Sequence, residues 1–486
     1  MPLNLNVLPS PWLVPGVYVG VDASGATQGT PDARRPALLL GLRRTTGTVA
    51  AAVLKPITGA TQGATYFGRG SQLAAMCSAF VAANPYAELY ALALDEDAAG
   101  AKATATITIT GSATADGTLS FVWGGRRRKV GVKTGDAFGT IAAAIKAADD
   151  LDPDSQTTST VALGVVTVSA RHKGAYGNDL AVEPNYYVGD KTPAGITVTV
   201  TAFTGGTTNP DVTDAIAAMG GDAPYYTIVP GWTDDANMDV LEDELESRWD
   251  PIRQIPGHAI ATLRATHTDS QTYGNARNMQ FSTVLAPGLT PTPPWAFAAA
   301  VAAVEVAETD PARPRQNLKI PGVLPPLEAN RFNITERNLL LMDGMSTVKV
   351  EAGEVYIERL VTTYQTNPGG EEDPSYKDIE VMRSIAHFRA GWRSRILRKY
   401  PNAKLGNDGE RFAPGQVVVT PKLLRGEALA YFDEQNLLAL VEDRKQFAAQ
   451  LIVERDQDNP NSMNVFMPPN FVNQLRTVAT LVAFKV

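Results

Sequence analysis

The sequence is poor in the residues that most often carry covalent or metal chemistry. Its 486 residues include one cysteine, Cys77, and four histidines. A single cysteine excludes an intrachain disulfide, so we expect a fold that does not rely on an oxidising compartment. Cys77 stands in a helical pattern, "SQLAAMCSAFVAAN", where we interpret it as a small buried side chain rather than a nucleophile.

The histidines give little support to a metal site. They are His172, His258, His267 and His387. None has an HxH or HExxH neighbour or a cysteine partner, which are the usual ligand spacings. His258 and His267 flank a predicted strand and would be able to approach each other, but the pattern favours ordinary core or surface positions.

Long hydrophobic runs and an excess of positive charge are also missing. The longest apolar stretch, residues 294–308, is rich in alanine and contains Glu305, which is typical of a buried helix rather than a membrane span. The first 16 residues carry no lysine or arginine and are broken by prolines, so we expect no signal peptide and folding in the cytoplasm. The chain has 43 basic and 51 acidic residues, and this balance argues against a nucleic-acid binder.

Catalytic motifs are missing as well. The stretch "GATYFGRGSQ" at 63–72 is only distantly similar to a phosphate loop, because Gly68 is followed by Arg-Gly instead of Lys and Ser or Thr. No G-x-S-x-G elbow occurs. The acidic clusters at 242–247 and 369–375 lack the spacing of a calcium loop. We therefore expect neither enzymatic activity nor a cofactor.

Two basic stretches leave alternatives open. "GGRRRKVGVK" at 124–133 is interpreted as the solvated face of a hairpin, with contact to phosphate or membrane as the alternative. "RAGWRSRILRK" at 389–399 holds five basic residues and no acidic one. This predicted helix would either dock an acidic partner surface or lie exposed with Trp392 packed in the core.

The length of the chain suggests two to four domains. Buried strands alternate with helices in two separate parts of the sequence, which predicts a mainly parallel α/β sheet. The predicted strands are 36–42, 87–94, 225–231, 257–263 and 281–288, and the predicted helices are 71–84, 234–249, 269–278 and one from about 294.

Between those two parts the composition shifts to Ala, Gly, Thr and Val, with short alternating runs and Gly-rich turns. This pattern predicts a β-rich domain inserted into the α/β domain. The predicted strands are 105–111, 117–125, 128–135, 164–171 and 195–203, with one helix at 136–150.

A Pro-rich stretch at 309–330 precedes a third predicted region with an α+β pattern. Apolar residues at helical spacing form one stripe along its first long helix. That stripe consists of Ile385, Phe388, Trp392 and Ile396. The predicted elements are strands around tight turns within 338–364, helices at 378–400 and 420–443, and a strand at 447–456.

Both ends of the chain read as strands without a local partner. Residues 15–22 and 478–486 alternate in the period of two that is typical of strands. A terminal strand needs partners for its backbone N–H and C=O groups, and no complementary hairpin strand lies nearby in the sequence. The residues of interest are Val17, Tyr18, Val19, Val21, Val478, Thr480, Val482, Phe484 and Val486.

Several stretches, taken in chain order, resemble the tail sheath proteins of contractile-tailed phages, specifically the Mu-like branch. No single stretch is diagnostic, but together they span nearly the whole chain. They are residues 14–22, 66–94, 117–132, 169–180, 231–249, 338–350, 386–409 and 467–484.

The resemblance implies a structural role in the virion tail, with assembly in the host cytoplasm. Sheath subunits form hexameric rings that stack helically around a tail tube, and contraction drives the tube through the host envelope. The implied partners are other copies of the chain, the tube protein, and baseplate and tail terminator proteins, with no nucleic acid and no direct membrane insertion. The terminal arms would add strands to neighbouring subunits.

The resemblance also implies a division of the chain, with the C-terminal domain against the tube and the inserted domain outward. Possible tube-docking residues are Arg389, Arg393, Arg395 and Arg398. The expected parts are an N-terminal arm at 1–35, an α/β domain at 36–100 and 206–330, an inserted β-rich outer domain at 101–205, an α+β sheath domain at 331–474 and a C-terminal strand arm at 475–486.

Two other classes stay open at this point. The Thr- and Gly-rich insertion would suit an adhesin-like surface protein, although the sequence offers no export signal. The α/β pattern would suit an enzyme such as a hydrolase, although no constellation around a nucleophile is present.

Overall fold

A computed structural model describes residues 34–485, and its largest feature is a nine-stranded mixed sheet with the order β14-β16-β15-β13-β12-β11-β1-β3-β2. The six neighbouring strands from β15 to β3 are parallel, while β2, β16 and β14 are antiparallel to their neighbours at the two sides. The strands are β1 (Ala37–Leu42), β2 (Leu54–Ile57), β3 (Leu89–Leu94), β11 (Thr227–Pro230), β12 (Ala259–Thr262), β13 (Ser282–Leu285), β14 (Leu318–Lys319), β15 (Met345–Glu351) and β16 (Glu354–Arg359).

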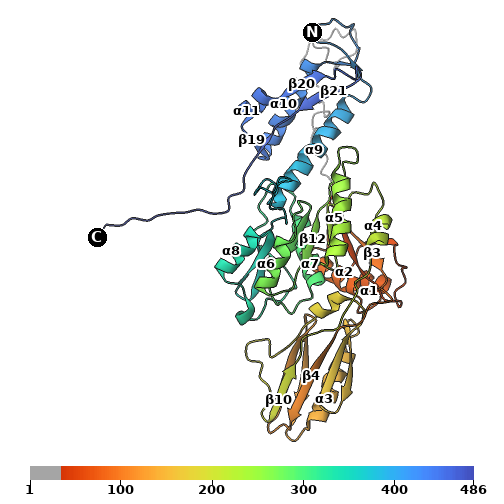
Figure 1. Ribbon diagram of the computed structural model, residues 1–486, viewed down its shortest axis with the longest axis vertical. Helices are drawn as coiled ribbons and strands as arrows, with labels where there is room; N and C mark the ends of the chain where they lie inside the picture. Colours follow the sequence, from red (N-terminus) through yellow and green to blue (C-terminus); the bar gives the residue numbers. More distant parts are fainter. Residues whose placement is uncertain (1–33, 486) are drawn as a thin grey trace, which may run out of the picture.

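Helices connect the parallel strands, as the alternating pattern predicts (Figure 1). All six residues of β1 are buried, in keeping with a strand covered on both faces. The Ser71 hydroxyl accepts a hydrogen bond from the backbone N–H of Ala74 and caps α2. The helices are α1 (Gln62–Phe67), α2 (Gln72–Ala83), α4 (Thr213–Ala218), α5 (Asp235–Trp249), α6 (His267–Asn275), α7 (Pro294–Ala307) and α8 (Ile334–Met342), with a short 3-10 turn at Glu328–Asn330.

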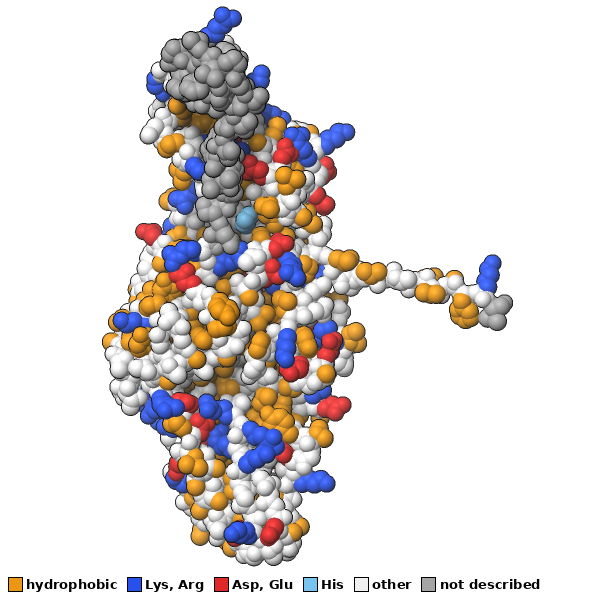
Figure 2. Space-filling view, turned by 180° about the vertical axis from the view of Figure 1, so that it is seen from behind, with side chains coloured by type: hydrophobic (Ala, Val, Ile, Leu, Met, Phe, Trp, Pro, Cys, Tyr) orange, Lys and Arg blue, Asp and Glu red, His pale blue; other side chains and the backbone are white. Residues whose placement is uncertain are grey.

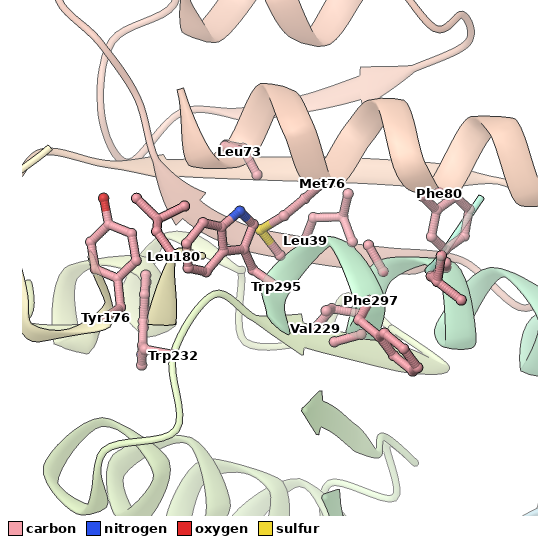
Figure 3. Close-up of a cluster of buried hydrophobic side chains, with 14 of the residues drawn as sticks. Leu39, Leu73, Met76, Phe80, Tyr176, Leu180, Val229, Trp232, Trp295 and Phe297 are labelled. Carbon is pink, nitrogen blue, oxygen red and sulfur yellow. The ribbon is translucent and has the colours of Figure 1, made fainter. Parts of the chain in front are cut away.

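The main core lies between this sheet and helices α2 and α7, which pack against each other. Figure 3 shows side chains of α2 and α7 meeting those of β1 and β11. Trp295 of α7 also contacts Tyr176, with ring centroids 5.0 Å apart and the planes at 75°. Because Tyr176 belongs to the Thr- and Gly-rich segment, that segment shares a hydrophobic core with the large sheet.

The Thr- and Gly-rich segment forms two antiparallel sheets and one long helix, at the lower end of the molecule in Figure 1. Every strand predicted there is present. Two strands were not predicted, because β7 is mostly Thr and Ser and β9 is only three residues long. The elements are β4 (Thr104–Gly111), β5 (Gly117–Trp123), β6 (Arg126–Val132), α3 (Phe138–Asp150), β7 (Thr157–Ala162), β8 (Val165–Ala170), a 3-10 turn at Ala175–Asp179, β9 (Val182–Pro184) and β10 (Ile196–Val200).

The last hundred residues form a smaller unit at the other end, joined to the sheet through the long helix α9 (Figure 1). It has its own cluster of buried side chains around Phe388, Tyr431 and Phe432. Its strands pair only in twos. The elements are α9 (Ile379–Lys399), β17 (Lys404–Leu405), β18 (Val418–Val419), α10 (Pro421–Leu437), β19 (Val441–Glu442), α11 (Arg444–Gln450), β20 (Ile452–Arg455), β21 (Met463–Phe466) and β22 (Asn470–Phe471).

Two sequence predictions are wrong in this half of the chain. The stretch expected to be only strands, 338–364, begins within helix α8, which a capping box between Asn333 and Glu336 starts. Its strands β15 and β16 complete the large sheet rather than a C-terminal one, because β15 pairs with β13. The strand expected at 447–456 is half helix, since Asp443 caps α11 before β20 begins.

The two predicted terminal strands are not seen as paired strands in residues 34–485. Residues 15–22 and Val486 lie outside the described residues. Residues 478–485 form no strand with any other segment in 34–485. Figure 1 shows this tail leaving the body of the molecule as a single extended chain. In residues 34–485, no helix combines the length and apolar character needed to cross a membrane.

Candidate assembly surfaces

The four arginines predicted to dock a partner divide into two kinds. Arg395 is buried and donates hydrogen bonds to Glu427 (2.8 Å) and Glu434 (2.7 Å) on α10. Arg389 donates to the carbonyl oxygens of Trp249 (2.6 Å) and Asp250 (2.9 Å), and burial lowers its pKa. These two side chains are therefore committed to contacts within the chain and serve its internal packing.

Arg393 and Arg398 are exposed on the same helix. Together with Trp249 and Leu397, they line a hollow of about 490 Å³. Of the four predicted arginines, these two have exposed side chains, and their role in docking stays a prediction. The sequence did not reveal this division, because the acidic partners of Arg395 come from α10, 32 and 39 residues further along the chain.

An apolar groove runs beside this hollow. Its volume is about 850 Å³, and it lies between residues 385–397 of α9 and the segment around β21. The predicted stripe on α9 forms one wall, together with Arg389, Arg393 and Leu397. The other wall contains Val465, Phe466, Met467, Pro469 and Phe471.

Strands β20 and β21 form a two-stranded antiparallel sheet with the register Ile452 opposite Phe466. Within residues 34–485 each of the two strands pairs only with the other, so each has one edge open. Ile452 and Phe466 are more than half exposed. An open edge with apolar side chains is the usual place where a further strand adds.

The C-terminal tail exposes apolar side chains on both of its faces. Val478, Val482 and Phe484 are 75%, 79% and 82% exposed, and Leu481, on the opposite face, is 95% exposed. Figure 2 shows hydrophobic side chains spaced along the projecting tail. No other part of residues 34–485 covers these side chains, and a stretch of exposed apolar side chains is typical of an interaction site.

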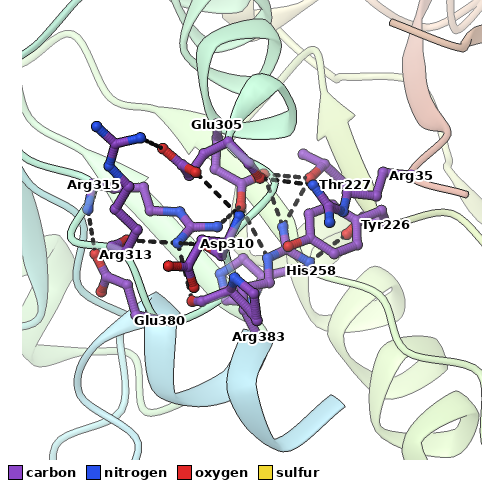
Figure 4. A network of polar contacts seen from close by, with 12 residues as sticks. Arg35, Tyr226, Thr227, His258, Glu305, Asp310, Arg313, Arg315, Glu380 and Arg383 are labelled. Atoms are coloured by element: carbon purple, nitrogen blue, oxygen red, sulfur yellow. Dashed lines mark hydrogen bonds and ion pairs between the residues drawn. The ribbon is translucent and has the colours of Figure 1, made fainter. Parts of the chain in front are cut away.

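A buried polar network lies where α9 meets the large sheet (Figure 4). Glu305 on α7 accepts hydrogen bonds from Arg383 on α9 and from Thr227 on β11. Arg315 lies beside Glu305, and its backbone N–H donates to Glu380. The network attaches the N-terminal part of α9 to the sheet, so it helps to determine the position of the C-terminal unit.

The other sequence candidates have structural roles. His172 lies beside Glu96, His258 shares a hydrogen bond with Thr283 at 2.7 Å, and His267 with the carbonyl of Glu336 at 3.0 Å. In the described part of the chain, no group of three or more His, Cys, Asp or Glu residues is placed to hold a metal. Cys77 is fully buried, and burial raises the pKa of its thiol.

The basic hairpin at 124–133 is only partly the solvated face that we expected. Arg128 is buried and pairs with Asp149 at 3.0 Å, and it lies 4.7 Å from the centre of the Trp123 ring. Arg126 and Arg127 pair with Asp152 and Asp190 at the edge of this cluster. Each of these arginines therefore has an acidic partner within the chain.

Comparison with known proteins identifies the class. Residues 205–363 match the phage tail sheath protein central domain, and residues 371–485 match the phage tail sheath C-terminal domain. The chain is also 39% identical over 487 residues to the Mu-like prophage FluMu tail sheath protein of Haemophilus influenzae, a match that covers 100% of both chains. The chain belongs to the phage tail sheath family.

Two solved structures are similar over most of their length. The sheath tail protein of Desulfitobacterium hafniense is 13% identical, with a TM-score of 0.47, and the match covers 94% of this chain and 100% of that one. A chain of the anti-feeding prophage baseplate in its contracted state is 12% identical, with a TM-score of 0.49 and coverage of 97% and 98%.

The resemblance to Mu-like sheath proteins that the sequence suggested is confirmed by the full-length match. The family is a structural one, and its place is in the phage tail. Membership of a structural family disfavours both the adhesin-like and the hydrolase alternatives.

Proposed function

We propose that this chain polymerises as stacked hexameric rings around a tail tube, and that contraction of the polymer drives the tube through the host envelope. The observation that carries the proposal is the C-terminal tail, whose apolar side chains are exposed on both faces of a single extended segment. In a polymer, every copy could cover this tail with a neighbour. Other copies, the tube protein, and the baseplate and tail terminator proteins are the proposed partners.

The tail acts as a strand donor in this proposal. Residues 478–485 alternate in a period of two, and the β20–β21 sheet of a neighbouring copy offers open edges with exposed Ile452 and Phe466. Strand addition satisfies the backbone groups of the donor and buries its alternate side chains. The N-terminal segment with Val17, Tyr18, Val19 and Val21 would be a second donor.

Such links suit a lattice that changes shape. Backbone hydrogen bonds in the arms persist while whole subunits rotate against one another, so the lattice remains connected. Repacking of rigid bodies between two interface arrangements is a recognised switching mode. The extended state would be metastable and would need no nucleotide.

We keep the proposed division of the chain with two changes, one to the start of the C-terminal domain and one to the start of the C-terminal arm, which was expected at residue 475. Strands β15 and β16 pair within the large sheet, so the C-terminal sheath domain would begin near the start of α9 at Ile379 rather than at residue 331. The Thr- and Gly-rich insertion at 101–205 would form the outer domain. Residues from 478 onward would form the arm itself.

Electron microscopy of the purified chain tests the proposal. We expect hollow striated tubes from the full-length protein and none after deletion of residues 478–486. A point variant sharpens the test, because Val482→Pro removes a backbone donor and resists strand pairing, whereas Val482→Ala keeps the backbone. Tubes from the deleted chain, or equal assembly by the two point variants, would contradict strand donation.

A further inference from the structure

The C-terminal tail begins with a short segment around Arg476, which we call its root. Hydrogen bonds hold this root against the protein, whereas the rest of the tail is exposed. The Nη2 atom of Arg476 donates to Glu380 (2.9 Å) and to Asp378 (3.1 Å), and its Nη1 atom donates to Gln316 (3.2 Å). The Gln316 amide in turn donates to the backbone carbonyl of Leu475 at 3.1 Å. These contacts fasten the chain to the N-terminal end of α9 and to the loop after α7.

The segment before the root is fastened to the other unit. Asn470–Phe471, strand β22, pairs with β19 in the C-terminal unit, and the N–H of Val472 donates to the carbonyl of Leu440. Within a few residues the chain therefore passes from the C-terminal unit to the sheet region. From Thr477 onward the tail is exposed. The transition from held to free chain falls at Arg476.

Glu380 gives the contact its strength. Its side chain is fully buried, and its second carboxylate oxygen accepts a hydrogen bond from the backbone N–H of Arg315 at 2.5 Å. Burial raises its pKa, and the charge of Arg476 opposes that rise. Removal of the Arg476 guanidinium would leave a buried carboxylate without its cation, which is costly. The planar guanidinium of an arginine presents its donors in a rigid geometry and so also fixes the direction of the contact, whereas the ammonium of a lysine would not.

We propose that Arg476 is a positioning residue, which fixes the direction in which the C-terminal arm leaves the subunit by clamping its root onto Asp378 and Glu380. This inference rests on the proposed role of the arm as a strand donor. A fixed exit direction restricts where the free strand can search for its acceptor, so binding loses less conformational freedom. The clamp also links the arm to the first turn of α9, the helix that joins the two units.

A spin label placed beside the clamp tests the inference in the full chain. The sole native cysteine is buried, so a cysteine introduced at exposed Thr477 can be labelled selectively. We expect the label at 477 to be immobilised in the parent protein and mobile in Arg476→Met. Below the concentration at which tubes form, a label at Val482 should be mobile in both. An immobilised label at 477 in Arg476→Met would overturn the clamp.

A second variant distinguishes the loss of arm positioning from the loss of stability that an unpaired buried charge would cause. Arg476→Met with Glu380→Gln removes the clamp and the unpaired charge together, so thermal stability should return while the label stays mobile. Recovery of an immobilised label in this double variant would show that the clamp does not position the arm. The matched control is Arg444→Met, which breaks an exposed pair with Asp433 and should leave the label unchanged.

Assembly then gives an independent readout. If the released arm points toward its acceptor about a tenth of the time, the concentration needed for tube formation rises about tenfold in the double variant. The concentration that Arg476→Lys needs for tube formation should lie between those of the parent and of Arg476→Met. An unchanged threshold in the double variant would overturn the role in assembly. If the parent itself forms no tubes, the proposed function fails, while the label at 477 still decides whether Arg476 holds the root.

Discussion

Arg383 on α9 and Glu305 on α7 face each other inside the protein, although 78 residues separate them. Both are almost fully buried, and the guanidinium reaches the two carboxylate oxygens at 3.0 and 3.1 Å. Arg383 also donates to Thr227 and lies 3.6 Å from the centre of the Tyr226 ring. This planar, paired side chain is therefore one of the contacts that attach the helix carrying the C-terminal unit to α7 and to the sheet.

Removing one partner of this pair should be costly. We expect Glu305→Gln to lower the free energy of unfolding by about 3–5 kcal/mol, because it leaves the buried Arg383 cation without its anion. The measurement is chemical denaturation of the chain truncated at residue 477, which avoids polymerisation. Asp433→Asn, in an exposed pair with Arg444, serves as control and should cost about 0–1 kcal/mol. Equal losses would show that burial of the pair is unimportant.

The second prediction concerns the close packing of α9 against α10 inside the C-terminal unit. A Cβ atom added at Gly391 on α9 would lie 2.3 Å from the Tyr431 hydroxyl oxygen on α10. Gly391→Ala should therefore destabilise the unit by about 1–3 kcal/mol, although alanine normally favours a helix. The double variant with Tyr431→Phe should recover part of the loss, which thermal unfolding would measure.

Gly426 on α10 provides the matched control for that prediction. A Cβ atom there meets nothing within 4 Å, so Gly426→Ala should stabilise the unit by about 0.5–1 kcal/mol through helix propensity alone. If both alanine variants stabilised the protein, the tight contact between α9 and α10 would be refuted.

The fold could be predicted best from the sequence where local residue patterns determine the structure. The apolar run of β1 and the Ser71 cap of α2 follow from burial on two faces and from side-chain capping. The pairing of β15 with β13 could not be predicted, because it joins segments about 60 residues apart across α7. The burial of Arg395 was missed for the same reason, since its acidic partners come from another helix.

We expect Asp179 to make the stability of the protein depend on pH. Burial raises its pKa from 3.8 to about 7, and the nearby Arg264 opposes the rise only in part. Between pH 4 and 7 the folded state therefore holds a proton that the unfolded state has released, so stability falls as pH rises through this window. Asp179→Asn should remove that loss and stabilise the protein by about 1–3 kcal/mol at pH 7.5, with little change at pH 4.

Denaturant midpoints measured from pH 4 to 8 check this expectation. The control is Asp243→Asn, at an exposed position on α5, which should leave the pH profile of the parent unchanged. A parallel shift of the whole profile in Asp179→Asn would contradict titration of the carboxylate, because an effect of packing alone would not depend on pH.

Charge reversal at the exposed face of α9 tests the docking of the proposed tube. Arg393 and Arg398 line the hollow beside the apolar groove, whereas Arg395 pairs internally with Glu427. We expect Arg393→Glu with Arg398→Glu to abolish co-assembly with tube protein in a sedimentation assay, because acidic groups of a partner would then be repelled. Sheath self-assembly and thermal stability should be unchanged. Arg395→Glu should instead lower stability by about 3–5 kcal/mol, since it places a third carboxylate beside two others. Normal co-assembly of the double variant would remove this face from the tube interface and would leave the arm and the β20–β21 edges as the proposed contact surfaces of the C-terminal unit.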